Sequence, residues 1–225
     1  MGKRKSPKKT SSLGGAEATK VTSDDEKKSV MRIARLFMTM QKKGVVWNRR
    51  EREGIKLIEG FQSALLALRD AQTVAPIAAD REKEKVEAVV QDKVVSNVVH
   101  DPWLTEDLYQ EIQKLSSGFE ELLEEMCTLQ VQAREIVLGR KDDVDQQVEA
   151  TQLRPVDYLQ MMSQELATFE AEYQHIEALL RLISFETSTD ELRTLLISWS
   201  TSPFLHPDQT RHFLQRHLLS NQLHT

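Results

Sequence analysis

A hydrophobic stripe with a period of 3.5 residues is the sequence feature that most constrains the fold. Its members follow one another at alternating steps of four and three: Leu108, Ile112, Leu115, Phe119, Leu122, Met126, Leu129, Ala133 and Ile136. A stripe of this period keeps facing a partner only when the helices wind around one another with a left-handed twist. Thr105 is expected to cap this helix, and Gly139 to follow its last residue. The spacing predicts one long helix packed against another.

A second stripe with the same steps follows after a connection over residues 139–155. Its members are Leu159, Met162, Leu166, Phe169, Tyr173, Ile176, Leu180 and Ile183. Pro155 stands where the first turn of a helix accepts proline. The connection is long enough for the chain to reverse, so residues 105–186 are predicted to form an antiparallel coiled-coil hairpin.

Residues 29–75 are predicted to form N-terminal helices that cover part of this hairpin. The first carries apolar residues from Val30 to Met40 and is expected to break at Gly44. The second runs from about residue 46 to 74 and is expected to end before Pro76. Residues 76–104 are interpreted as a charged linker or a marginal helix, and these two alternatives stay open.

The C-terminal segment, residues 187–225, is predicted to be a short helical docking element. A capping box at Ser188–Glu191 precedes a helix, and a Pro-rich apolar link at 203–207 leads to a last helix. Tryptophan is enriched at binding hot spots. The residues predicted to contact a partner are Trp199, Pro203, Phe204, Leu205 and Leu196. Alternatively, Trp199 closes the end of the bundle.

The fold class expected from these patterns is all-α: an elongated helical bundle with an antiparallel coiled-coil hairpin and a short C-terminal helical element. The scarcity of helix breakers, 8 Gly and 6 Pro in 225 residues, agrees with long helices.

Charge separates the N-terminus from the rest of the chain. Residues 1–28 carry eight bases and four acids, a charge of +4, whereas the whole chain carries −5, which leaves −9 for residues 29–225. The first segment has few large apolar residues, so a disordered basic tail is predicted. An acidic body repels phosphate backbones, which disfavours direct nucleic-acid binding except weakly through the tail.

The tail also carries a candidate nuclear-localisation signal, formed by Lys3, Arg4, Lys5, Lys8 and Lys9. Ser6 precedes Pro7 in a pattern favoured by cyclin-dependent kinases and is a candidate phosphorylation site. The alternative is an ordinary solubilising basic terminus. We therefore expect a nuclear protein.

No pattern typical of catalysis or cofactor binding is found in the sequence. A phosphate-binding loop is absent, no two histidines lie four residues apart, and Cys127 is the one cysteine. The acidic residues Glu120, Glu121, Glu124 and Glu125 are interpreted as a solvated face or as a contact surface for basic residues. The sequence predicts no enzyme, cofactor, metal, small-molecule ligand or membrane span.

The C-terminal segment resembles the ending of the cyclin-dependent kinase 2-interacting protein family. The residues that carry the resemblance are Asp190-Glu191-Leu192, the run Leu195-Leu196-Ile197-Ser198-Trp199, and Pro203-Phe204-Leu205, followed by Leu218-Leu219. In that family an Asp-Leu pair leads into a leucine helix, then Trp, three residues, Pro, an aromatic and an aliphatic residue. The similarity covers residues 190–219 in detail and about 105–219 in organisation. Arg211 is shifted by one residue, so no function is transferred to it.

This resemblance implies a non-enzymatic nuclear adaptor. Its implied partners are replication kinases, a checkpoint adaptor of ATR signalling, and subunits of a chromatin-associated AAA ATPase complex that acts in replisome turnover and ribosome biogenesis. A different class of function is a self-associating coiled-coil subunit of a kinetochore- or tether-type complex, in which the same stripes pair with a second copy.

Overall fold

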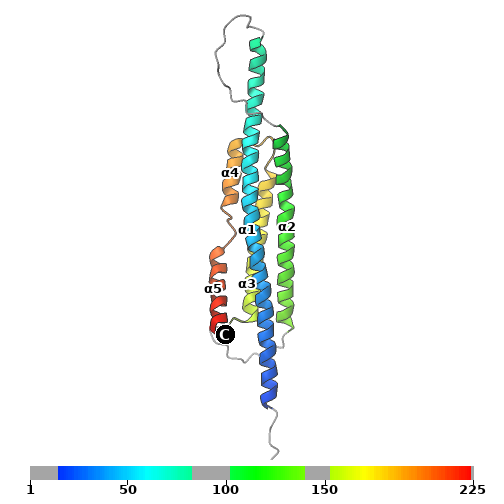
Figure 1. Ribbon diagram of the computed structural model, residues 1–225, viewed down its shortest axis with the longest axis vertical. Helices are drawn as coiled ribbons and strands as arrows, with labels where there is room; N and C mark the ends of the chain where they lie inside the picture. Colours follow the sequence, from blue (N-terminus) through cyan, green and yellow to red (C-terminus); the bar gives the residue numbers. More distant parts are fainter. Residues whose placement is uncertain (1–14, 83–101, 140–152, 224–225) are drawn as a thin grey trace, which may run out of the picture.

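A computed structural model describes residues 15–82, 102–139 and 153–223, which form five helices and no strand. The helices are α1 (Gly15–Glu82), α2 (Pro102–Leu138), α3 (Pro155–Arg181), α4 (Thr189–Ser200) and α5 (Pro207–Leu223). Figure 1 shows α1, α2 and α3 side by side in an elongated bundle, with successive helices running in opposite directions. The shorter α4 and α5 follow one another along the bundle and together form its fourth layer beside the three long helices. The expected all-α bundle is confirmed.

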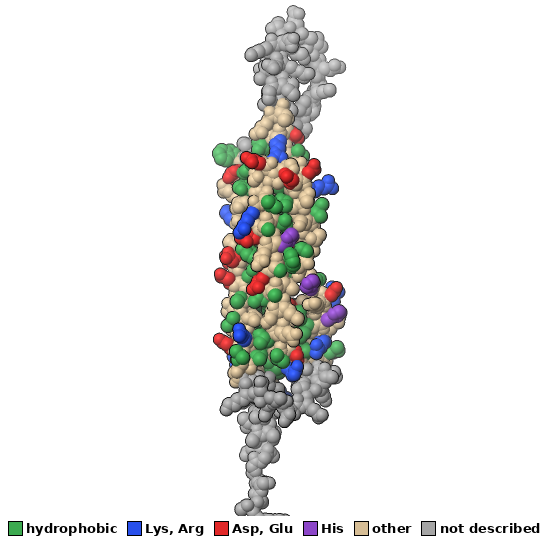
Figure 2. Space-filling view, turned by 180° about the vertical axis from the view of Figure 1, so that it is seen from behind, with side chains coloured by type: hydrophobic (Ala, Val, Ile, Leu, Met, Phe, Trp, Pro, Cys, Tyr) green, Lys and Arg blue, Asp and Glu red, His purple; other side chains and the backbone are tan. Residues whose placement is uncertain are grey.

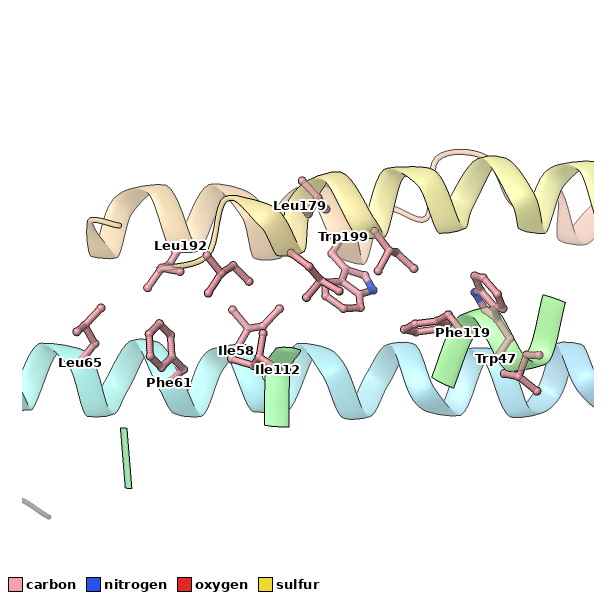
Figure 3. Packing of buried hydrophobic residues seen from close by; sticks show 13 residues of the cluster. Trp47, Ile58, Phe61, Leu65, Ile112, Phe119, Leu179, Leu192 and Trp199 are labelled. Carbon is pink, nitrogen blue, oxygen red and sulfur yellow. The ribbon is translucent and has the colours of Figure 1, made fainter. Parts of the chain in front are cut away.

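Two stacked hydrophobic clusters form the core. The upper cluster includes Trp47, Ile112, Phe119, Ile176 and Trp199, and the lower cluster includes Phe37, Met126, Tyr158, Met162 and Phe213. In Figure 3 the labelled residues of the upper cluster point toward one another from α1, α2, α3 and α4. All members of the two predicted stripes lie in these clusters or pack against them.

The predicted break at Gly44 is wrong, because α1 continues through this residue. A glycine in a helix costs about 1 kcal/mol relative to alanine, and tertiary packing can outweigh that cost. A Cβ at position 44 would lie 3.3 Å from the ring of Phe169 in α3. The glycine therefore lets α1 approach α3 closely, and it does not end the helix.

Three helix boundaries also differ from the expectation. Helix α1 begins at Gly15, inside the segment 1–28, and ends at Glu82, beyond Pro76. Helix α2 begins at Pro102, so Thr105 is not its cap; proline is well suited to the first turn, and Thr105 is buried within the helix. Residues 1–14 of the predicted tail and 83–101 of the predicted linker lie outside the described residues.

Other predicted boundaries are confirmed. Helix α2 ends at Leu138, directly before Gly139, and Pro155 is the first residue of α3. The capping box at α4 is formed by reciprocal bonds: the Glu191 amide donates to Ser188 Oγ at 3.2 Å, and the Ser188 amide donates to Glu191 Oε2 at 2.8 Å. Among the described residues, no helix is long and apolar enough to cross a lipid bilayer.

Candidate functional site: the α4–α5 link and the adjacent groove

The link between α4 and α5 turns at Ser202, which has a φ of +40°. Pro203 and Phe204 then lie on the surface, and Phe204 is 43% exposed. The backbone amide of Phe204 donates to Glu172 Oε2 at 3.1 Å, and the ring lies 5.9 Å from that of His175. The link is thus attached to α3 through its backbone and still presents an aromatic side chain to solvent.

The five residues predicted to contact a partner do not form one surface. Trp199 is only 1% exposed and packs in the upper cluster, against Gly54 of α1 and near Phe119 of α2. Leu196 and Leu205 are half-buried, and Pro203 and Phe204 are exposed. Trp199 therefore belongs to the core of this chain and cannot contact a partner unless the helices separate. Pro203 and Phe204 stay accessible.

Three buried glutamates hold the C-terminal segment against the bundle, and no pattern in the sequence indicates them. Glu51 of α1 and Glu165 and Glu172 of α3 are each less than one-tenth exposed. Glu51 accepts a hydrogen bond from Trp47 Nε1 at 2.9 Å and a long one from Ser202 at 3.5 Å. Glu165 accepts from Gln41 at 2.6 Å and from Thr210 of α5 at 2.7 Å. Together with Glu172, these residues contact the link or α5 in three places.

Burial shifts the acidity of all three carboxyl groups. Desolvation, together with the nearby charge of Glu172, raises the pKa of Glu51 to about 7, against the lowering effect of its hydrogen bonds. Desolvation also raises the pKa of Glu165 and of Glu172, against the hydrogen bonds that each accepts. The site therefore contains one carboxyl group, that of Glu51, whose pKa lies close to neutral pH, and two others whose pKa is raised.

A groove of about 590 Å³ lies between α1, α3, the α4–α5 link and α5. Its apolar lining includes Met40, Val45, Phe169, Leu205 and Leu214. Its polar lining includes Asn48, Glu51, Glu165, Thr210 and Arg211. Figure 2 views the molecule from behind, where hydrophobic side chains form a broken band along the bundle among charged ones.

The remaining predicted features are distributed elsewhere. Lys3, Arg4, Lys5, Ser6, Lys8 and Lys9 lie outside the described residues. The four acids of α2 are exposed, and Glu125 forms an ion pair with Lys43 of α1 at 2.5 Å. Cys127 is exposed. In the part of the chain that the structure describes, no three His, Cys, Asp or Glu residues are grouped so that they could hold a metal ion.

Comparisons with protein-family models, with curated proteins and with solved structures find no match to this chain.

Proposed function

We propose that this protein is a non-enzymatic nuclear adaptor, similar to the cyclin-dependent kinase 2-interacting protein family. It links replication kinases, ATR checkpoint signalling and a chromatin-associated AAA ATPase complex that acts in replisome proteostasis and ribosome biogenesis. The observation that carries this proposal is the run from Asp190 to Leu205, with its Trp-Pro-aromatic spacing. In support, Pro203 and Phe204 of this run are exposed on the link between α4 and α5.

Affinity purification from nuclear extract, followed by mass spectrometry, tests the proposal. Phe204→Ala removes an exposed ring without opening the core, whereas Trp199→Ala would empty a core position. Leu66→Ala on α1 is the matched control, because Leu66 is 48% exposed and Phe204 is 43% exposed. We expect the wild type and the control to recover AAA ATPase subunits and replication kinases, and Phe204→Ala to lose them.

The possible outcomes test the docking site and the adaptor function separately. If Phe204→Ala recovers the same partners as the wild type, the assignment of the link as docking site is wrong. If the wild type recovers neither ATPase subunits nor kinases and forms a monodisperse homodimer by light scattering, the adaptor proposal fails. That second result would favour the self-associating structural subunit.

A further inference from the structure

One carboxylate oxygen at the groove accepts no hydrogen bond from the described residues. Glu51 lines the groove and is 7% exposed. Among the described residues, Trp47 and Ser202 donate to its carboxylate, and both reach Oε1. Oε2 accepts no such bond and is not fully buried, so this oxygen is open to the groove. A hydrogen-bond donor that enters the groove can therefore reach this oxygen.

The electrostatic surroundings favour a cationic donor. Within the described part of the chain, no lysine or arginine forms an ion pair with Glu51. Glu165 also lines the groove and the charge of Glu172 acts on Glu51, so both residues of α3 add negative potential when they are ionised. His206 and Arg211 also line the groove, but Arg211 is exposed and pairs with Asp208 at 3.2 Å, which limits its influence.

The walls of the groove select among cations. An aliphatic stem fits against Met40, Val45, Phe169 and Leu205, while a terminal charge reaches the acid. A guanidinium group prefers two carboxylate oxygens, whereas an ammonium group is a compact point charge. Because Oε1 of Glu51 is already occupied, the site suits lysine better than arginine.

We propose that this groove binds a lysine side chain of a partner protein, with the ammonium group on Glu51 and the aliphatic stem along the apolar wall. The partner is basic at this contact, in agreement with the charge of −9 on residues 29–225. The inference goes beyond the adaptor function and depends neither on Phe204 nor on the identity of the partner. The lysine site can therefore be wrong while the adaptor function is right, and the reverse also holds.

Lysine binding is coupled to the ionisation of Glu51. The pKa of this residue is raised to about 7, mainly by burial, and a bound ammonium group favours the ionised form. Only the ionised form is competent to bind, so the apparent affinity follows its population. Between pH 6 and pH 8 this population rises about tenfold for a group of that pKa, and binding is expected to tighten by about the same factor.

An NMR titration of the full chain tests the inference. The probe is Nα-acetyl-L-lysine methylamide, and the same compound with an acetylated side-chain nitrogen is the uncharged control. The indole N–H signal of Trp47 reports on the site, because this group donates to Glu51. We expect the lysine probe to shift this signal in a saturable manner, more tightly at pH 8 than at pH 6, and the uncharged control to have no such effect.

Two variants complete the test. Glu51→Gln keeps an oxygen that can accept from Trp47 but removes the charge, and is expected to weaken binding at least fivefold. Glu59→Gln, on the exposed side of α1, is the matched control and is expected to bind like the wild type. Equal shifts with charged and uncharged probes, equal affinity of Glu51→Gln, or an unchanged Trp47 signal at large probe excess would each overturn the inference.

Discussion

At the scale of single residues, the buried glutamates are the most unusual feature of the bundle. A carboxylate removed from water is unfavourable unless hydrogen bonds or a cation compensate it. Glu172 accepts from the backbone of Phe204 through Oε2, while its buried Oε1 has no partner among the described residues. Trp199 Nε1 is also buried without a partner there. The packing of the C-terminal segment against the bundle therefore buries polar atoms without hydrogen-bond partners, which purely apolar side chains would not do.

Because the pKa of each of these glutamates is raised, we expect the protein to become less stable as the pH rises toward neutral. The pKa of Glu51 is higher in the folded state than in the unfolded state, so the folded state binds more protons. The contribution of this residue to stability is therefore fully present below pH 4.5 and is lost as the pH rises through about 7. Glu51→Gln is expected to remove up to about 3 kcal/mol of this dependence, at 1.36 kcal/mol for each pKa unit. Urea denaturation between pH 5 and pH 8 measures it.

Glu59→Gln serves as control and is expected to keep the wild-type pH dependence, because Glu59 is exposed. If the slopes of Glu51→Gln and the wild type coincide, Glu51 is not the group responsible.

Two glycines of α1 are predicted to respond in opposite ways to alanine. A Cβ at Gly54 would lie 2.9 Å from two ring atoms of the buried Trp199, whereas one at Gly60 would be in ordinary contact with Leu108 at 3.6 Å. Gly60→Ala is expected to stabilise the protein by about 0.5–1 kcal/mol through helix propensity. Gly54→Ala is expected to destabilise it by about 1–3 kcal/mol through overpacking.

Urea titrations of the two glycine variants beside the wild type measure this difference. A stabilising Gly54→Ala would show that Trp199 does not rest against α1 as described.

At the scale of elements, the fourth layer of the bundle consists of two short helices with separate attachments. Gln62 of α1 donates to the Thr189 carbonyl of α4 at 2.7 Å, and Trp199 anchors α4 in the upper cluster. Helix α5 instead places Phe213 against Phe37, with ring centroids 5.0 Å apart. The turn at Ser202 lies between these attachments, so we expect each helix to be able to loosen without the other.

The attachments of α5 include a buried hydrogen bond between Tyr158 Oη and His217 Nδ1 at 2.6 Å. Burial raises the pKa of Tyr158 to about 12 and lowers that of His217, so both groups are neutral near pH 7. Tyr158→Phe is expected to weaken this contact by about 1 kcal/mol. Amide hydrogen exchange should then be about fivefold faster in α5, with α4 unchanged.

Tyr173→Phe is the matched control for this experiment. It also removes a tyrosine hydroxyl contact, to Ser116 at 3.1 Å, but between α2 and α3. We expect exchange in α5 to be unaffected by this variant. Faster exchange in α4 and α5 together in Tyr158→Phe would mean that the fourth layer opens as one unit.

At the scale of the whole molecule, the two core clusters share only a few side chains. Leu123 and Phe169 pack against both clusters, and the ring of Phe169 lies 5.0 Å from that of Trp47. A Cβ at Gly44 would lie 3.3 Å from the ring of Phe169, so this ring lies where α1 and α3 approach each other closely. These residues therefore couple the two ends of an elongated bundle.

Phe169→Ala is predicted to uncouple the clusters in addition to lowering stability by about 3–5 kcal/mol. Tryptophan fluorescence reports mainly on the upper cluster through Trp47 and Trp199, while far-UV circular dichroism reports on all helices. The two transitions are expected to coincide in the wild type and to separate in the variant. Ile176→Ala, within the upper cluster alone, should lower stability with coincident transitions. Coincident transitions in Phe169→Ala would show that other contacts couple the clusters.

The helices and their inward faces were predictable from the sequence because they depend on local periodicity. The 3.5-residue stripes of α2 and α3, the capping box at Ser188 and the stop at Gly139 involve residues close together in the chain. Local spacing alone was therefore enough to predict an all-α bundle.

Only the tertiary structure decided which side chains of other helices each helix packs against. Gly44 stays within α1, where its missing Cβ leaves room for the ring of Phe169, and Trp199 is a core residue because Gly54 leaves room for its ring. Glu51, Glu165 and Glu172 are ordinary charged residues by spacing, and they become buried because α4, α5 and their link cover that side of α1 and α3. The groove combines residues more than 100 positions apart, a proximity that no local pattern encodes.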